Sequence, residues 1–192
     1  MRYVSIDIEC TGLSEDSNDI LEFGAVLDDL NDQKPLDSLP VFHCYFIQDN
    51  YVGEPMALSM HPLIFRRIAT REQGFTYISP NKFGHSFRRF LVDNGYKEER
   101  DKVTINAAGK NFSSFDLQFL KRKTDLLKHV NIRSKVLDPA ILYFHPDDLS
   151  LPGMETCKSR AGMGDKVMHD AVNDAKDVVI LLRNAMNRLF KL

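Results

Sequence analysis

The sequence predicts an α/β domain with a mixed central sheet, which begins with three antiparallel strands and is flanked by helices. Two observations predict this fold class. The first 50 residues hold three strand-like runs joined by short connections, which favours an antiparallel meander. Strand-like and helical runs then alternate along the rest of the chain. The length of 192 residues suits one domain, and we expect a single domain over residues 1–192.

The three opening strands are predicted at residues 3–9, 20–27 and about 41–47. The first alternates strictly, so one face carries apolar side chains and the other carries polar ones. The apolar face has Val4, Ile6 and Ile8, and the polar face has Ser5, Asp7 and Glu9. The connection before the third strand is rich in Asp, Asn and Pro, as a turn requires.

The middle of the chain changes to helical spacing. Apolar residues predict helices at 58–68 and 83–92, and a short buried strand at 103–108. The pair Ser113 and Ser114 is suited to N-capping and predicts a helix that continues to about Lys123.

A further strand, turn and helix are predicted around 135–144, and the Pro- and Gly-containing segment 146–164 is predicted to be a loop. The last helix has the clearest pattern, because its apolar residues fall on one stripe. That stripe contains Met168, Ala171, Val172, Ala175, Val178, Val179, Leu182, Ala185, Met186 and Leu189.

Composition excludes several classes of protein. Apolar residues make up 43% and charged residues 27%, which are ordinary globular values. The longest aliphatic run, at 178–182, is far shorter than the ~20 residues of a membrane-spanning helix. The N-terminus lacks the apolar stretch of a secretory signal. Three widely spaced cysteines fit neither a disulfide framework nor a thiolate zinc site, so we expect a reducing, cytoplasmic location.

Acidic residues supply the candidate chemistry. Asp7 and Glu9 are two apart on a strand, so both carboxylates point to the same side and could hold a hard divalent cation. This D-x-E pattern alone is weak, because about 0.8 copies are expected by chance in this composition. Asp116 opens a predicted helix, where an acid would also complement the helix dipole.

The segment from His169 to Asp174 has the pattern H-x-A-x-x-D, for which about 0.03 copies are expected by chance. The two residues lie about 140° apart around an ideal helix. Both therefore reach one site only if His169 lies at or before the first turn. The alternative interpretation is a capped amphipathic helix with an ordinary surface histidine.

In this order, the three motifs resemble the DEDDh family of 3′-to-5′ exonucleases over nearly the whole chain. The resemblance implies an RNase H-like fold. It also implies two divalent cations, Mg²⁺ or Mn²⁺, and a histidine as the general base. Carried over residue by residue, the metal ligands are Asp7, Glu9, Asp116 and Asp174, and the base is His169.

The resemblance further implies that Thr11, Gly12 and Leu13 hold the terminal nucleotide. Cys10 departs from the threonine common at that position in the family. Asn111, five residues before Asp116, follows the spacing of oligoribonucleases and is included among the substrate contacts.

Other substrate contacts are predicted from residue type. Phe112 could stack a base, because aromatic stacking tolerates any base, whereas burial is expected for Phe115. Lys158, Arg160 and Lys166 are the best candidates for phosphate contacts, since they precede His169. His43 and His61 have no motif support, and structural or surface roles are expected for both.

The leading hypothesis is a metal-dependent 3′-to-5′ exonuclease that releases nucleoside 5′-monophosphates. Its partners would be single-stranded DNA or RNA 3′ ends or short oligonucleotides, with no membrane; a homodimer is left open. The formal net charge of −2 argues against coating of long nucleic acid but permits a short substrate. Two alternatives remain: an HD-type phosphohydrolase, which is all-helical, and a catalytically silent nucleic-acid-binding module of the same fold.

Overall fold

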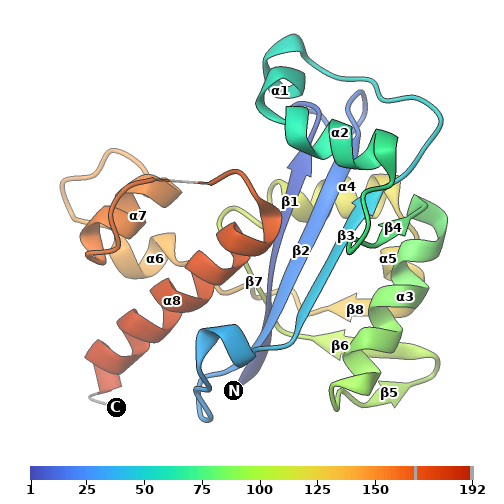
Figure 1. Cartoon of the computed structure of the whole chain (residues 1–192). Helices are drawn as coiled ribbons and strands as arrows, with labels where there is room; N and C mark the ends of the chain where they lie inside the picture. The colour runs from blue at the N-terminus through green and yellow to red at the C-terminus, as the bar shows by residue number, and fades with distance from the viewer. Residues whose placement is uncertain (167, 191–192) are drawn as a thin grey trace.

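A mixed five-stranded sheet forms the centre of the molecule (Figure 1). The structure is a computed structural model that describes residues 1–166 and 168–190. The spatial order is β4 (Tyr77–Ile78), β3 (Val41–Phe46), β2 (Ile20–Asp29), β1 (Arg2–Cys10) and β7 (Ala107–Ala108). β1, β2 and β3 pair antiparallel, whereas β4 and β7 are parallel to their neighbours. The predicted fold class, with its antiparallel three-strand start, is confirmed.

A second, three-stranded sheet consists of β5 (Glu98–Glu99), β6 (Lys102–Ile105) and β8 (Val130–Ile132). The strand expected at 103–108 is therefore divided between two sheets. Asn106 lies at the division: its side-chain amide donates to the backbone oxygen of Arg2, at 2.9 Å. Of the strand expected after residue 135, the structure shows a single bridge between Leu137 and Ala108.

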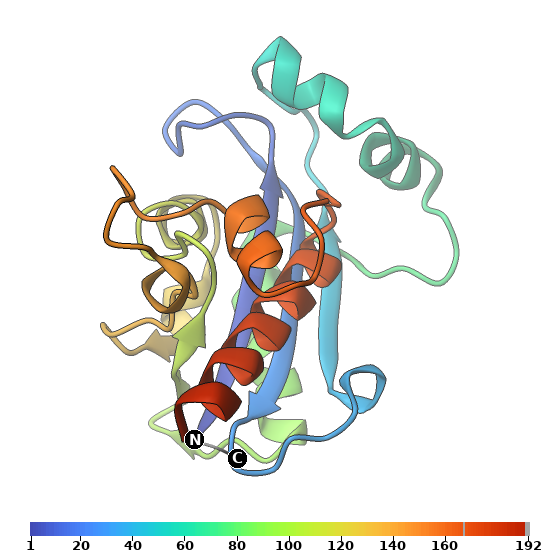
Figure 2. The same cartoon turned by 90° about the vertical axis from the view of Figure 1, so that its left-hand side faces the viewer.

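Helices cover both faces of the central sheet (Figures 1 and 2). α8 (Ala171–Phe190) lies along one face of β1 and β2, and α3 (Pro80–Asp93) lies on the other side. The alternation predicted for β1 separates the two cores. Val4, Ile6 and Ile8 pack with the phenylalanines of α3, whereas Tyr3 packs with Val178, Val179 and Leu182 of α8.

The remaining helices are short, and their positions around the sheet differ. α1 (Pro55–Met60) and α2 (Pro62–Thr70) lie beyond the carboxyl end of β1 (Figure 1). The others are η1 (Leu36–Ser38), α4 (Asp116–Lys123), α5 (Leu126–His129), α6 (Ala140–Tyr143) and α7 (Met154–Arg160). No helix in the described ranges has the length and apolar character to cross a bilayer.

Several predicted boundaries are wrong for identifiable reasons. The helix expected at 58–68 is two helices, because Pro62 starts a new one and cannot continue the first. α7 lies inside the segment expected to be a loop, since Gly153 acts as its N-terminal flank rather than as a breaker. Neither serine of the pair at 113 and 114 caps α4, whose N-cap is Phe115 and has no side-chain cap bond.

The last helix begins three residues later than its apolar stripe. Met168 is 51% exposed and precedes the helix, and Leu189, near its end, is also exposed. The central sheet also rules out the all-helical architecture of HD-type phosphohydrolases.

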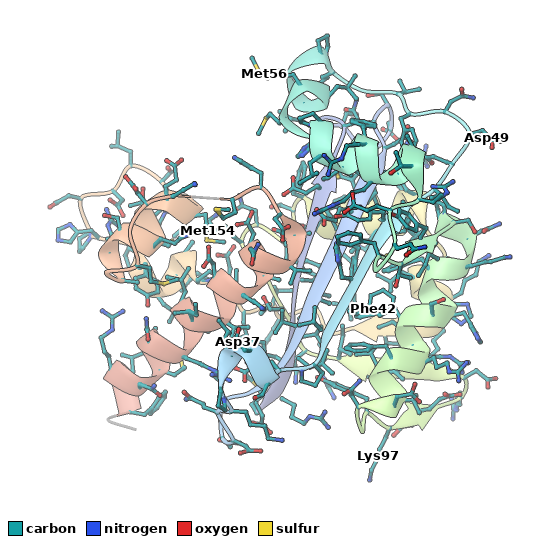
Figure 3. All side chains as sticks on the ribbon, viewed as in Figure 1. Asp37, Phe42, Asp49, Met56, Lys97 and Met154 are labelled. Atoms are coloured by element: carbon teal, nitrogen blue, oxygen red, sulfur yellow. The ribbon has the colours of Figure 1, made fainter. Side chains whose placement is uncertain are left out.

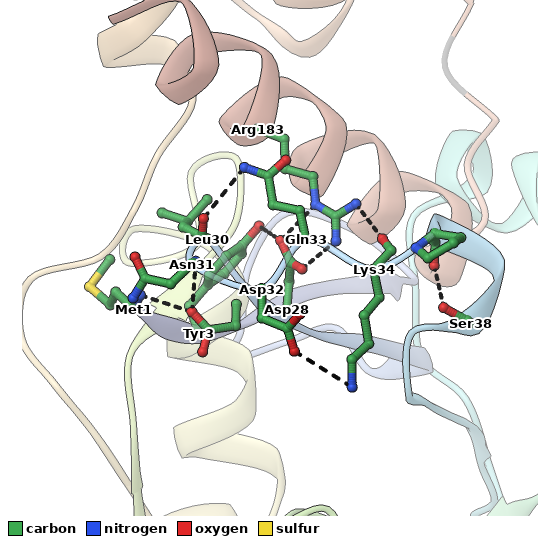
Figure 4. Close-up of polar contacts among 12 residues, drawn as sticks. Met1, Tyr3, Asp28, Leu30, Asn31, Asp32, Gln33, Lys34, Ser38 and Arg183 are labelled. Carbon is green, nitrogen blue, oxygen red and sulfur yellow. Dashed lines mark hydrogen bonds and ion pairs between the residues drawn. The ribbon is translucent and has the colours of Figure 1, made fainter. Parts of the chain in front are cut away.

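A buried ion pair fastens α8 to β2 (Figure 4). The Arg183 guanidinium donates to both carboxylate oxygens of Asp28, at 3.0 and 2.5 Å. The Tyr3 hydroxyl donates to the same carboxylate at 2.7 Å. Burial, together with the negative charge of Asp28, raises the pKa of Tyr3, so the phenol stays a neutral donor.

Candidate metal centre and active site

β1 directs its polar residues toward the start of α8. Ser5, Asp7 and Glu9 share the face covered by this helix, and the Ser5 hydroxyl donates to the backbone oxygen of Ala175 at 2.8 Å. In the antiparallel register, Asp7 lies opposite Gly24 of β2, and Glu9 lies opposite Glu22. The polar face of the first strand is therefore covered by protein rather than by water.

Gly24 allows the close approach of α8. A Cβ atom at this position would lie 2.4 Å from the carbonyl carbon of Ala171, which is far inside van der Waals contact. The first residue of α8 consequently packs on the backbone of β2. This contact places Asp174, in the first turn of α8, beside the carboxylates of β1.

Three of the predicted functional side chains converge. Ligand atoms of Glu9, His169 and Asp174 lie within 4.8 Å of one another. They line a cavity of about 200 Å³ together with Asp7, Ile8, Lys110 and Met154. Asp174 is 5% exposed, and its Oδ1 atom is buried without a hydrogen-bond partner among the described residues. Such an oxygen fits a metal ligand, because a buried acceptor left unsatisfied is costly.

Asp116 approaches from α4. It is 4% exposed, and its Oδ1 atom accepts the backbone N–H of Ile8 at 3.2 Å. It does not line the cavity, but its negative charge is the strongest of those that act on Asp7. The structure therefore brings Asp116 close to Asp7, which lines the cavity.

The pKa values of all four carboxyl groups are raised. Burial first, and the neighbouring Asp116 and Glu9 charges second, raise the pKa of Asp7 well above its ordinary range. Burial and the Glu22 and Asp174 charges raise the pKa of Glu9 to about 9, and burial raises that of Asp116 to about 7. Burial also raises the pKa of Asp174. Bound cations would relieve this repulsion, so the donor set fits divalent metal ions.

His169 lies just before α8, which meets the condition that it lie at or before the first turn. Its backbone has φ of 51°, and its side chain is exposed at the cavity. The following residue, Asp170, stabilises the helix start, since its Oδ1 accepts the Asn173 N–H at 3.0 Å and its backbone oxygen accepts the Asp174 N–H at 2.9 Å. This cap ends the loop and lets both functional side chains face Glu9.

A second cavity adjoins the first. Its volume is about 270 Å³, and it includes Ile8 and Glu9, which also line the first cavity. Its other lining residues are mostly apolar: Cys10, Gly12, Leu13, Glu54, Met56, Ala57, Met60, His61 and Phe115. Figure 3 labels Met56 on α1 and Met154 on α7, one from each cavity. A flat apolar group could therefore lie beside the acidic cluster.

The predicted substrate residues divide into two groups. Gly12 and Leu13 line the second cavity, and Leu13 is 76% exposed. Thr11 is fully buried instead; its hydroxyl donates to Val52 O at 2.5 Å and accepts the Asp19 N–H at 2.8 Å. Thr11 thus shapes the loop, and its hydroxyl is not available to a ligand.

The base-stacking role predicted for Phe112 is wrong, and the burial expected for Phe115 is only partial. Phe112 is fully buried in the main core and cannot stack a base, whereas Phe115 is partly exposed and lines the second cavity. Both phenylalanines follow the turn that precedes α4. In this turn Asn111 has φ of 59° and donates its N–H to Asp138 Oδ2 at 2.9 Å. Asn111 itself is exposed but lines neither cavity.

Two predicted phosphate contacts are also wrong. Lys158 is 6% exposed, forms an ion pair with Asp177 of α8 and donates to the backbone oxygen of Lys166 at 2.5 Å. Arg160 forms a two-pronged pair with Asp148, at 2.6 and 2.7 Å. Lys158 is therefore held inside the protein, and neither Lys158 nor Arg160 lines the first cavity.

Sequence reasoning missed three residues of the site. Lys110 and Met154 line the first cavity. His61 is buried, with its Nε2 atom 3.5 Å from Glu9 Oε2. Burial and the neighbouring His169 imidazole lower the pKa of His61. The position of Lys110 just after a predicted strand could have indicated a site residue. No local sequence pattern indicated Met154 or His61.

Comparison with protein-family models and with curated proteins finds no match. Solved structures do match. The S. pombe Pop2p structure, in a form with bound Mg²⁺ and Mn²⁺, has a TM-score of 0.60 and 16% identity, over 98% of this chain and 84% of its own. Cell-death related nuclease 4 has a TM-score of 0.66 and 13% identity, over 97% and 64%.

E. coli Exonuclease I, solved in complex with a dT13 oligonucleotide, has a TM-score of 0.62 and 18% identity, over 99% of this chain and 42% of its own. This chain thus spans less than two thirds of two of these three proteins. At these identities the likeness shows the fold, and the fold expected from the motif resemblance is confirmed.

Proposed function

We propose that this protein is a metal-dependent 3′-to-5′ exonuclease that acts on single-stranded ends or short oligonucleotides. The observation that carries the proposal is the convergence of Glu9, His169 and Asp174 within 4.8 Å, with a buried Asp174 oxygen that has no partner among the described residues. The fold, which is also that of Exonuclease I and cell-death related nuclease 4, supports it.

Two Mg²⁺ or Mn²⁺ ions would be held by four carboxylates. Asp7, Glu9, Asp116 and Asp174 offer the oxygen ligands that hard cations prefer. The charges of neighbouring carboxylates raise the pKa of Asp7 and of Glu9, and bound cations would relieve that repulsion. Four negative charges would be cancelled by the two ions.

When bound, such ions lower the pKa of an attacking water and stabilise the charge that develops on the phosphate and the leaving oxygen. The protein supplies the rest. The exposed His169 imidazole accepts the proton of the water, since imidazole is the side chain that most often serves as a general base. Lys110, which lines the same cavity, provides a positive charge for a phosphate oxygen.

The second cavity would hold the terminal base. Its apolar walls, including Leu13 and Phe115, present surfaces on which any base can stack. Because both cavities share Ile8 and Glu9, a base in one places the adjoining phosphate toward the carboxylates in the other. The product would be a nucleoside 5′-monophosphate.

We place the protein in the cytoplasm. The three cysteines are free and buried, which is compatible with a reducing compartment.

The direct test is the degradation of 5′-labelled single-stranded DNA and RNA oligomers of several lengths, run side by side with Mg²⁺ or Mn²⁺. We expect stepwise shortening from the 3′ end. Activity should be lost in excess EDTA and in Asp7→Ala. Full activity in EDTA would overturn the proposal, and binding of the oligomer without cleavage would identify a silent module.

The histidine assignment has its own test. His169→Ala should lose about 10²–10⁴-fold in kcat, while Mn²⁺ binding measured by calorimetry stays within a few fold of the wild type. A wild-type rate in this variant would reject His169 as the base.

A further inference from the structure

We propose that Glu22, held by His43, is a positioning residue that sets the start of α8, so that Asp174 and His169 face Glu9. This inference rests on the proposed function for the role of the site, and it adds two residues that the ligand set does not contain.

Glu22 connects three elements. It lies on β2 directly opposite Glu9 of β1, and it is 1% exposed. Its Oε1 atom is 2.6 Å from Nε2 of His43 on β3. Its Oε2 atom accepts the backbone N–H of Ala171, the first residue of α8, at 3.4 Å. One carboxylate therefore links two strands to the helix that carries Asp174.

The electrostatic effect of Glu22 on the site is unfavourable. Its charge is the largest charge contribution to the raised pKa of Glu9, and it also acts on Asp7. A fifth buried acid thus adds repulsion to four carboxylates that already repel one another. That repulsion applies to the metal-free protein, whereas the contacts of Glu22 hold a backbone N–H that no intrahelical bond satisfies.

His43 restrains the Glu22 side chain. The imidazole lies on β3 opposite Gly24, and its ring meets the Tyr45 ring edge-on, with centroids 4.9 Å apart and planes at 70°. With one oxygen on His43, the other Glu22 oxygen is aimed at Ala171. The histidine therefore limits the rotamers available to Glu22.

The same strand and helix offer a matched control. Asp28 lies six residues from Glu22 on the same face of β2 and binds Arg183, twelve residues along α8 from Ala171. Both acids are buried and both fasten α8 to β2. Only Glu22 lies beside the site, so loss of stability and loss of positioning can be separated.

The experiment compares Glu22→Ala, Glu22→Gln and Asp28→Asn with the wild type. Mn²⁺ affinity is measured by calorimetry without nucleic acid, together with the thermal midpoint, kcat and KM. We expect Glu22→Ala to bind Mn²⁺ about 10–100-fold more weakly and to lose kcat by a similar factor, with KM little changed. Glu22→Gln keeps an acceptor for Ala171 and should restore both values to within about threefold of the wild type.

Asp28→Asn should lower the thermal midpoint while leaving Mn²⁺ affinity and kcat near the wild-type values. Equal effects of Glu22→Ala and Asp28→Asn on all four quantities would overturn the proposal. A Glu22→Gln variant as impaired as Glu22→Ala would also overturn it, because the charge and not the contacts would then matter. If Glu22→Ala does not fold, His43→Ala replaces it in the experiment, because His43 is only partly buried. We expect this variant to bind Mn²⁺ more weakly than the wild type, and unchanged Mn²⁺ binding would overturn the proposal.

The two proposals can fail separately. A wild type that binds Mn²⁺ but degrades no oligomer overturns the exonuclease, while Mn²⁺ affinities of the variants still decide the role of Glu22. A wild type that binds no Mn²⁺ overturns both.

Discussion

At the scale of the residue, Asp174 combines burial, a raised pKa and an oxygen without a partner in the described chain. A carboxylate in that state destabilises the metal-free protein and becomes favourable only when a cation binds it. One substitution of Asp174 should therefore show both its effect on the stability of the metal-free protein and its effect on activity.

Asp174→Asn should lower kcat by at least about 100-fold, because a metal ligand is lost, and it should raise the thermal midpoint in EDTA at pH 8. The midpoint rises because the neutral amide no longer repels the neighbouring carboxylates. Nuclease assays and thermal melts with and without Mn²⁺ check both effects. Wild-type activity, or a lower midpoint in EDTA, would contradict the assignment.

At the scale of the element, the start of α8 determines the site. Asp170 caps the helix, Gly24 admits its first residue to the surface of β2, and Ser5 bonds the backbone one turn later. His169 and Asp174 lie on either side of this start. A small displacement of the helix would therefore separate both side chains from Glu9.

Gly24→Ala tests this dependence. The new methyl group would lie 2.4 Å from the carbonyl carbon of Ala171, so α8 must move away from β2. We expect a stability loss of about 1–3 kcal/mol and a fall in kcat of at least about 10-fold, since misplacement by 1 Å can cost more than that. Gly153→Ala, at a site where no atom of the described residues lies within 4 Å of the new methyl group, is the matched control. An active Gly24→Ala variant would show that α8 does not need this contact.

At the scale of the whole molecule, the acidic cluster couples stability to pH and metal. Glu9 and Asp116 have pKa values of about 9 and 7 in the folded protein, against about 4 for ordinary carboxyl groups. The folded state thus holds protons that the unfolded state releases. The stability contributed by these protons is complete below about pH 4 and is lost as pH rises to about 9.

In EDTA, the thermal midpoint should accordingly fall between pH 5 and pH 9. Mg²⁺ or Mn²⁺ should raise it most at the upper end of that range, because the ions bind deprotonated carboxylates. Nuclease activity should increase with pH over the same interval. Thermal melts of Glu9→Gln in EDTA provide the comparison. If the midpoint of this variant falls with pH as steeply as that of the wild type, Glu9 is not a source of the pH dependence.

The amino-acid sequence by itself determined the order of the main elements and the residue types of the site. The alternation of β1 assigns Asp7 and Glu9 to one face, because successive side chains of any strand point to opposite sides. The spacing of His169 and Asp174 required the histidine to lie at or before the first turn of the helix, and α8 begins at Ala171. These are local properties, which the backbone geometry of a few consecutive residues imposes.

The tertiary structure decided which side chains are accessible and which partners they meet. It buried Phe112 and left Phe115 partly exposed, paired Lys158 with Asp177, and brought Glu22 of β2 to the first residue of α8. Glu22 and Ala171 are 149 positions apart in the chain. No local pattern specifies such a contact, because it depends on how the faces of distant elements pack together.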